Sequence, residues 1–460
     1  MSAFLILTLC AGLSSASVTI NGTALDQIDD IIEFTTGSHV DEKFSLLKFM
    51  KDRGGAFSYY PVYGKADGSN ITLTQGGVHN NGNVAHQAGK TNTGIYPVVG
   101  KQKTSDGKLV VLFPAAQDDN KLFINSIKIS GNNKDYSLTD ESYFYKTIDE
   151  KANLYVNDSA SGILPDGNNG HEIFAVSYFI ANSGKRPGFN QTYDSYIALV
   201  DPEGQSFKLH RIGGMNGTFP SIRVTAGDFD NDGVSNELAV IRDGSGMDYY
   251  MQVFKVDSGL NVNEIYHASI GRRNDDGDNI DGCDITAGDF NGDNNNEIAV
   301  VYANKIDYDG YPSITIFSWD GSTFTQKTDN NEDNNVRVGS TYWTRSSYVP
   351  HFGITAEAGD INDDGQDELI FLTASYGSSE GNIVVSVWGA DDNLQPKKYF
   401  YRRTSQKIAG YGGVGGTDMA ECSYLPRSLS LALVPTGEKL SSGGIAICER
   451  HMLFTPEISH

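Results

Sequence analysis

The chain has 460 residues and a formal net charge of −23, with 58 Asp and Glu against 35 Lys and Arg. Nucleic acids and anionic membrane surfaces repel such a chain, so we expect neither as a partner. Only 39% of the residues are hydrophobic, yet 24 Tyr, 22 Phe and 3 Trp suffice to build a core. The 51 Gly indicate frequent turns, and the composition as a whole predicts an acidic protein rich in β-structure.

Residues 1–16 are typical of a secretory signal peptide. An apolar run from Phe4 to Ala11 precedes small residues, with Ser14 and Ala16 at the −3 and −1 positions of a cleavage site. The run is too short to span a bilayer, and no later window is apolar enough to predict a membrane span. A buried N-terminal strand is the alternative interpretation. We therefore expect a protein that is secreted, extracellular or displayed at the cell surface.

Three cysteines remain beyond the predicted signal peptide, which is too few for a disulfide framework. Cys422 and Cys448 are close enough in sequence to pair in an oxidising compartment. Cys283 is expected to be buried and to lie outside any disulfide.

Residues 17–95 are predicted to form an extension that precedes the repeats. Apolar residues recur there at helical spacing, at Leu25, Ile28, Ile31, Ile32, Phe44, Leu47 and Met50. This spacing predicts one or two short helices between residues 25 and 53. Residues 54–95 are rich in Gly, Asn and Tyr and indicate no particular element. The extension is a candidate source of one strand for the repeat region.

The rest of the chain contains an internal repeat. The three clearest copies read VTAGDFDNDGVSNELAVI from Val224, ITAGDFNGDNNNEIAVVY from Ile285 and AEAGDINDDGQDELIFLT from Ala356. Their shared glycines, Gly227, Gly288 and Gly359, are 61 and 71 residues apart. Each copy ends in an acidic residue and a short apolar run, and a further alternating stretch follows. This pattern predicts strands that are joined by hairpins.

Weaker copies extend the series in both directions. Apolar runs at 109–112 and 173–176 lie upstream, while runs at 431–434 and 443–447 resemble a copy without its acidic loop. A repeat of this length holds about four strands, which is typical of a blade, the four-stranded sheet of a β-propeller. We predict an all-β propeller over residues 96–460, with about seven four-stranded blades, six of them marked in sequence. The last blade is incomplete or is completed by an N-terminal strand.

A hairpin loop in each clear copy carries side-chain oxygens at alternate positions. We call residues 228–237 loop 1, residues 289–297 loop 2 and residues 360–368 loop 3. Such oxygens point at one centre, where a hard divalent cation binds about six to eight of them and relieves the repulsion between carboxylates. The candidate ligands are Asp228, Asp230, Asp232, Asn236 and Glu237 in loop 1, Asp289, Asn291, Asp293 and Glu297 in loop 2, and Asp360, Asn362, Asp364 and Glu368 in loop 3.

Loops 1 and 2 depart from the common pattern. Loop 2 has Asn294 where Gly233 and Gly365 permit a sharp turn, and asparagine tolerates a left-handed backbone better than most residues. Loop 1 has one extra residue, so either Asn236 or Glu237 is its last ligand. Ordinary turns and EF-hand loops use the same residue types. Three copies in register, each before a strand and not a helix, favour metal binding.

The loops resemble the FG-GAP repeats, also called VCBS repeats, of integrin α-chain propellers and many secreted propellers. The resemblance covers residues of about 160 to 375, and Phe352-Gly353 matches the first half of the name, while Gly-Ala-Pro is absent. It implies a propeller with about three bound calcium ions that stiffen the hairpins. It also implies that the backbone carbonyls of Val234, Asn295 and Gln366 are ligands.

Three further segments are interpreted structurally. Residues 410–415 match G-x-G-x-x-G by letter, but no helix is predicted after them, so a loop is favoured over a dinucleotide site. The acidic run 275–281 is interpreted as a solvated loop in preference to a fourth ion site. Residues 342–345 place aromatic side chains next to an arginine, where packing between blades is favoured over stacking on a sugar.

The repeated loops favour a calcium-binding extracellular module for adhesion to, or binding of, a glycan or protein ligand. No catalytic residue is predicted, because no nucleophile–base pair is recognisable. One alternative is a polysaccharide-active enzyme, since some polysaccharide lyases resemble this architecture. It would bind acidic sugars at a basic patch formed by Lys397, Lys398, Arg402 and Arg403. The other alternative is a structural domain of a larger surface protein.

Overall fold

Every element among the described residues is a β-strand. The computed structural model describes residues 18–20, 23–24, 31–40, 43–51, 57–67, 70–75, 101–103, 109–116, 121–130, 139–151, 154–165, 172–182, 191–217, 222–244, 248–272, 283–306, 309–330, 354–359, 365–375, 381–408, 431–435 and 443–447, with side chains in parts of 122–398. No helix in these ranges is long and apolar enough to cross a membrane. The predicted signal peptide, Cys422, Cys448 and the segments 275–281, 342–345 and 410–415 lie outside the described residues.

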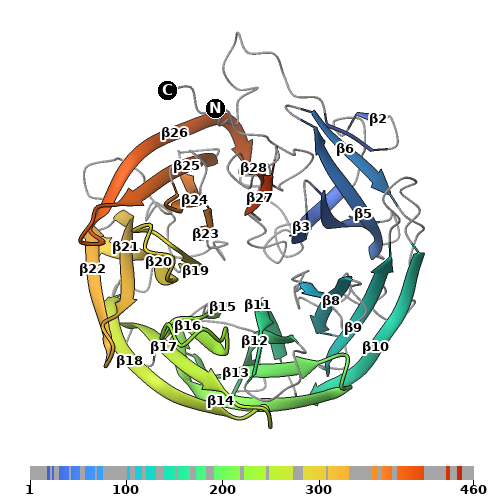
Figure 1. The fold of residues 1–460 in the computed structure, drawn as a ribbon, viewed down its shortest axis with the longest axis horizontal. Helices are drawn as coiled ribbons and strands as arrows, with labels where there is room; N and C mark the ends of the chain where they lie inside the picture. Colours follow the sequence, from blue (N-terminus) through green and yellow to red (C-terminus); the bar gives the residue numbers. More distant parts are fainter. Residues whose placement is uncertain are drawn as a thin grey trace.

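The strands form seven sheets that stand side by side around a ring (Figure 1). Five sheets have four antiparallel strands each, joined in chain order. These are β7 (Lys101–Lys103), β8 (Leu109–Ala116), β9 (Lys121–Ser130) and β10 (Thr139–Glu150); β11 (Leu154–Ile163), β12 (Ile173–Ala181), β13 (Gln191–Asp201) and β14 (Ser206–Gly217); β15 (Ile222–Gly227), β16 (Glu237–Asp243), β17 (Asp248–Val256) and β18 (Val262–Arg272); β19 (Cys283–Gly288), β20 (Glu297–Ile306), β21 (Asp309–Trp319) and β22 (Phe324–Asn330); and β23 (Ile354–Gly359), β24 (Glu368–Ser375), β25 (Gly381–Ala390) and β26 (Pro396–Ile408).

Two further sheets complete the ring. One has six strands in the order β2-β1-β6-β5-β4-β3, and the other pairs β27 with β28. Their bounds are β1 (Val18–Ile20), β2 (Thr23–Ala24), β3 (Ile31–Val40), β4 (Lys43–Lys51), β5 (Phe57–Asp67), β6 (Asn70–Gln75), β27 (Leu431–Pro435) and β28 (Gly443–Ile447). The inner strands β3, β7, β11, β15, β19, β23 and β27 contact one another in turn, and β27 contacts β3. The predicted β-propeller is therefore confirmed, and the ring closes between the two ends of the described chain.

The N-terminal region differs from its prediction. The prediction of short helices between residues 25 and 53 is wrong, because β3 and β4 occupy most of that stretch. Its β-branched and aromatic residues favour strands, and pairing of β4 with both β3 and β5 overrides the helical spacing. Residues 17–95, expected as an extension that supplies one strand, contain all six strands of a sheet in the ring (Figure 1).

The second strand of each central sheet is buried on both faces. All seven residues of β16 are buried. Leu238 and Val240 pack against the preceding sheet, whereas Ala239 and Ile241 pack against the following one. Both faces of the strand are covered, so its sequence is a continuous apolar run and does not alternate. This is why the apolar runs of the repeats located the second strands correctly.

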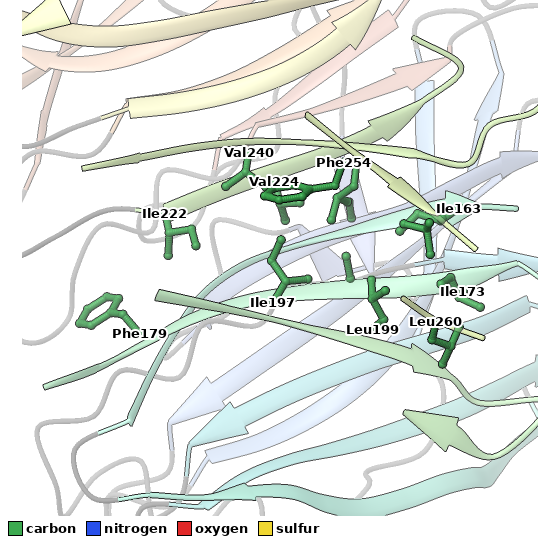
Figure 2. Close-up of a cluster of buried hydrophobic side chains, with 14 of the residues drawn as sticks. Ile163, Ile173, Phe179, Ile197, Leu199, Ile222, Val224, Val240, Phe254 and Leu260 are labelled. Atoms are coloured by element: carbon green, nitrogen blue, oxygen red, sulfur yellow. The ribbon is translucent and has the colours of Figure 1, made fainter. Parts of the chain in front are cut away.

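One interface between sheets is shown in Figure 2. Ile197 and Leu199 of β13 face Val224 of β15 and Val240 of β16, and all of these side chains are buried. Burial of each such side chain contributes about 1.5–3 kcal/mol. Cys283, at the start of β19, is also buried, as predicted.

The close approach of neighbouring sheets predicts the effect of a substitution at Gly288. A Cβ added there would lie 2.8 Å from the Cβ of Ala358, in β23 of the next sheet, and 2.9 Å from Oδ2 of Asp367, in the loop that follows β23. The Ala358 Cβ moves only with its backbone, so Gly288→Ala should lower the free energy of unfolding by about 1–3 kcal/mol. Urea denaturation measures this change.

Gly214→Ala is the matched control for that measurement. A Cβ at Gly214 would have the backbone oxygen of Tyr193 as its nearest neighbour, at 3.9 Å. We expect this variant to stay within about 0.5 kcal/mol of the unsubstituted protein. Equal stability of the two variants would contradict the tight contact at Gly288.

Candidate functional site

Loops 1, 2 and 3 occupy the same hairpin in three successive sheets. Each joins the first strand of its sheet to the second strand. The glycine that ends the first strand pairs with the glutamate that begins the second, as Gly227 with Glu237, Gly288 with Glu297, and Gly359 with Glu368. The register predicted from the repeat is therefore present in the fold.

Loop 1 is shaped by hydrogen bonds from its own backbone to its carboxylates. Asp228 accepts the backbone N–H of Asp232 at 3.1 Å and that of Gly233 at 2.9 Å. Asp232 accepts the N–H of Val234 at 2.9 Å. Glu237 Oε2 accepts an N–H bond of 3.1 Å from the residue after Asp228, which ties the two ends of the loop together.

Loop 2 repeats this pattern. Asp289 accepts the N–H of Asp293 at 3.0 Å and that of Asn294 at 2.8 Å, and it also accepts the N–H of Gly292 at 2.7 Å. Asp293 accepts the N–H of Asn295 at 2.8 Å. Glu297 Oε2 accepts an N–H at 3.0 Å from the residue after Asp289. Two loops of different length thus fold around carboxylates at the same positions.

Two further features fix these loops. Phe229 and Phe290 follow the first aspartate of each loop, and their rings are fully buried between sheets. The turns need left-handed backbone, with φ of 86° at Gly233 and 66° at Asn294. Asparagine in place of glycine therefore adopts the conformation that the sequence predicted for it.

The carboxylates of loop 1 gather at one point. Oxygen atoms of Asp228, Asp230 and Glu237 all lie within 4.8 Å of one another. Glu237 is fully buried, and its burial, with the nearby charge of Asp230, raises its pKa to about 7. Glu237, one of the two alternatives for the last ligand, belongs to this group, and the choice between it and Asn236 stays a prediction. Asn236 is also buried, and its side-chain amide makes no hydrogen bond among the described residues.

Loop 2 also places carboxylates near a buried glutamate, Glu297. Burial, together with the charges of Asp293, Asp289 and Asp367, raises the pKa of Glu297 to about 8. The side-chain amide of Asn291 donates to Asp293 at 3.1 Å and to Glu297 at 3.4 Å. Within the described part of the chain, no Lys or Arg pairs with these loop 2 carboxylates. A divalent cation fits this donor set, because it would offset a negative charge that the protein leaves uncompensated.

Loop 3 is described only in part. Asp360, Asn362 and Asp364 lie outside the described residues, while Glu368 is buried at the start of β24. The end of this loop is joined to loop 2. Asp289 donates its N–H to Asp367 Oδ2 at 2.8 Å, and Asp367 donates its N–H to the Asp289 carbonyl at 2.7 Å. Neighbouring loops are therefore held in a fixed relation by reciprocal hydrogen bonds.

Two of the residues whose backbone carbonyls are expected as ligands take part in hydrogen bonds within or between the loops. The Val234 carbonyl accepts a hydrogen bond of 2.8 Å from the N–H of Asn236, so it already has a partner. The side chain of Gln366 donates to the carbonyl of Asn291 at 3.4 Å, which again links loop 3 to loop 2. The participation of Val234, Asn295 and Gln366 in metal binding stays a prediction.

A second group of acidic residues, not found from the sequence, lies on the inner strands. Asp158 Oδ2 accepts the N–H of Val224 at 2.9 Å, and Asp284 Oδ2 accepts the N–H of Ala356 at 2.7 Å. Each bond joins an inner strand to the inner strand of the next sheet. The loops could be recognised in the sequence because their acidic pattern repeats. A single acidic residue within a short strand belongs to no repeated pattern, so the sequence did not mark it.

These inner acids perturb one another. Burial, together with the charges of Asp284 and Asp158, raises the pKa of Glu357, on β23, to about 8. Burial also raises the pKa of Asp158 to about 7, although the charge of Arg223 acts in the opposite direction. The inner strands therefore concentrate carboxyl groups that bind protons more tightly than they would in water.

Comparison with known proteins finds similarity in structure and none in sequence. No protein-family model matches the chain, and no curated protein matches it. Solved structures with a similar arrangement include a fucose-specific lectin from Aleuria aurantia, at 9% identity and a TM-score of 0.40, with 82% of this chain and 96% of that chain covered. A second is Chaetomium thermophilum Sqt1 bound to the N-terminus of a ribosomal protein, at 9% identity and a TM-score of 0.41, with 94% of this chain and 98% of that chain covered. A third is a variant of NanB sialidase from Streptococcus pneumoniae, at 10% identity and a TM-score of 0.42, with 90% of this chain and 83% of that chain covered. Likeness at these identities concerns the fold and brings no activity to this chain.

The raised pKa of Glu357 predicts how stability depends on pH. The ordinary pKa is 4.5, so between about pH 5 and pH 8 the folded protein binds more protons at this site than the unfolded chain does. The free energy of unfolding therefore falls as the pH rises through this range. Glu357→Gln removes this contribution and should make the fall shallower. Urea denaturation at pH 5, 6, 7 and 8 in the presence of chelator measures it.

Asp392→Asn is the control, because Asp392 is exposed in the turn before β26. This variant should keep the pH dependence of the unsubstituted protein. If Glu357→Gln kept it as well, the tight proton binding inferred for Glu357 would be wrong.

Proposed function

We propose that the protein is a secreted, calcium-stabilised β-propeller that acts outside the cell or at its surface as a binding module for a glycan or a protein ligand. The observation that supports the proposal is the recurrence of one hydrogen-bonded, carboxylate-rich loop at the same hairpin of successive sheets. Loop 2 supports it further, because no Lys or Arg of the described residues pairs with Asp289, Asp293 or Glu297 to offset their charge.

The residues of loop 2 that would hold the ion are Asp289, Asn291, Asp293 and Glu297, with the Asn295 carbonyl. Calcium prefers oxygen ligands of this kind and accepts an irregular arrangement of them. Asp289 and Glu297 hold the two ends of the loop, and Phe290 anchors it in the core between the sheets. A bound ion would therefore stiffen the hairpin between β19 and β20, and through Asp367 the neighbouring sheet as well.

A stiff ring is suited to binding, because loops that are fixed to a rigid frame hold a ligand with little loss of entropy. The competing proposal, an enzyme that acts on acidic polysaccharides, has one observation in its favour. Lys397 and Lys398 are exposed on β26, the outermost strand of its sheet. The side chains of Arg402 and Arg403 lie outside the described residues, so the predicted basic patch stays a prediction.

Thermal unfolding with calcium and with excess chelator tests the calcium part of the proposal. Binding to the folded state alone at a free concentration of about 100 times Kd adds about 2.7 kcal/mol per site. We therefore expect a rise of several degrees in Tm with calcium. Asp289→Asn combined with Glu297→Gln should reduce that rise, whereas Asp392→Asn in an exposed turn should not. A Tm that is the same in calcium and chelator contradicts the proposal.

A glycan array probed in calcium tests the choice of ligand. Binding to a defined group of glycans supports a glycan ligand, and binding to none shifts the proposal to a protein partner. Incubation with acidic polysaccharides tests the enzyme. Release of unsaturated uronate products, followed by their ultraviolet absorbance, would replace the binding module with a lyase.

A further inference from the structure

Loop 1 differs from loop 2 in the charge that faces its carboxylates. Lys255 lies on β17, directly opposite Glu237 on β16. Its Nζ lies 2.8 Å from Asp230 Oδ2, 2.6 Å from Asp232 Oδ2 and 3.3 Å from Glu237 Oε1. One ammonium group thus contacts three of the carboxylates that the sequence marks as metal ligands.

Lys255 donates hydrogen bonds to Asp230 and Asp232, and it also lies at ion-pair distance from Glu237. An ammonium group has three N–H donors and no acceptor, and here three carboxylate oxygens surround it. Its side chain is 27% exposed and that of Glu237 is fully buried, so water screens the attraction only in part.

The lysine is specific to the first of the three clear copies. The strand that follows each apolar run has an aromatic residue in a matched register, as Leu238 pairs with Phe254, Ile298 with Phe317 and Leu369 with Trp388. The residue after that aromatic is Lys255 in the first copy, Ser318 in the second and Gly389 in the third. The position that faces the loop glutamate is therefore cationic beside loop 1 and uncharged beside loops 2 and 3.

We propose that Lys255 is the resident cation of loop 1, where it takes the place of a calcium ion, so that calcium binds at loops 2 and 3 only. An ammonium group and a divalent ion at one centre repel each other and compete for the same oxygens. The extra residue in loop 1 fits this assignment, because the loop departs from the metal-binding pattern in its length as well as in its partner. The inference rests on the proposed calcium binding of the other loops.

Equilibrium dialysis against calcium, with the bound ions counted per folded chain, tests this assignment. We expect two ions in the unsubstituted protein. Lys255→Ser, which places the loop 2 residue beside loop 1, should raise the number to three. Ser318→Lys, the reciprocal change, should lower it to one. Lys327→Ser removes an exposed lysine from β22 and should leave the number at two.

The possible results separate the inference from the proposal on which it rests. Three ions in both the unsubstituted protein and Lys255→Ser overturn the role of Lys255 and leave calcium binding intact. No bound calcium in any variant overturns the proposed calcium binding and the inference with it. If circular dichroism shows that Lys255→Ser does not fold, the number of calcium ions bound by Ser318→Lys tests the inference instead. An unchanged number of bound ions in Ser318→Lys overturns the inference.

Discussion

Burial of each sheet on both faces is the constraint on which the structure depends. Val240 and Ile241 are neighbours in β16, yet they pack against different sheets, one before and one after their own. A single sheet would therefore leave two apolar faces in water, and in a series of sheets the two outermost faces are covered only when the ring is complete. Contact between β27 and β3 is thus a requirement of the fold, and the loops are positioned by it because Phe229 and Phe290 belong to the same packing.

Charge is arranged around this apolar frame in two different ways. In loop 1 the carboxylates are balanced by Lys255 from the same sheet. In loop 2 and on the inner strands, burial and neighbouring acids raise the pKa of Glu297 and of Glu357 to about 8. An acidic chain of net charge −23 thus keeps some of its carboxyl groups where ionisation is unfavourable without a cation or a proton.

The sequence was informative where a pattern recurs. Apolar runs such as Leu238 to Ile241 identified second strands because those strands are buried on both faces, and the glycine-to-glutamate spacing located the hairpins. The N-terminal sheet escaped prediction because its apolar residues match a helical period by chance, and only pairing between distant segments decides their conformation. Lys255 escaped because its partner Asp230 is 25 residues away in the chain, and register between strands, not proximity in sequence, brings them together.

The carboxylates of Asp158 and Asp284 have a consequence for the solubility of the ring. β15 and β23 are edge strands of their sheets, and an edge strand with open N–H groups can pair with a strand from another chain. Asp158 takes the N–H of Val224 on β15, and Asp284 takes that of Ala356 on β23. At these two positions a side chain from the neighbouring sheet already accepts from the N–H, so this donor is not available to an added strand.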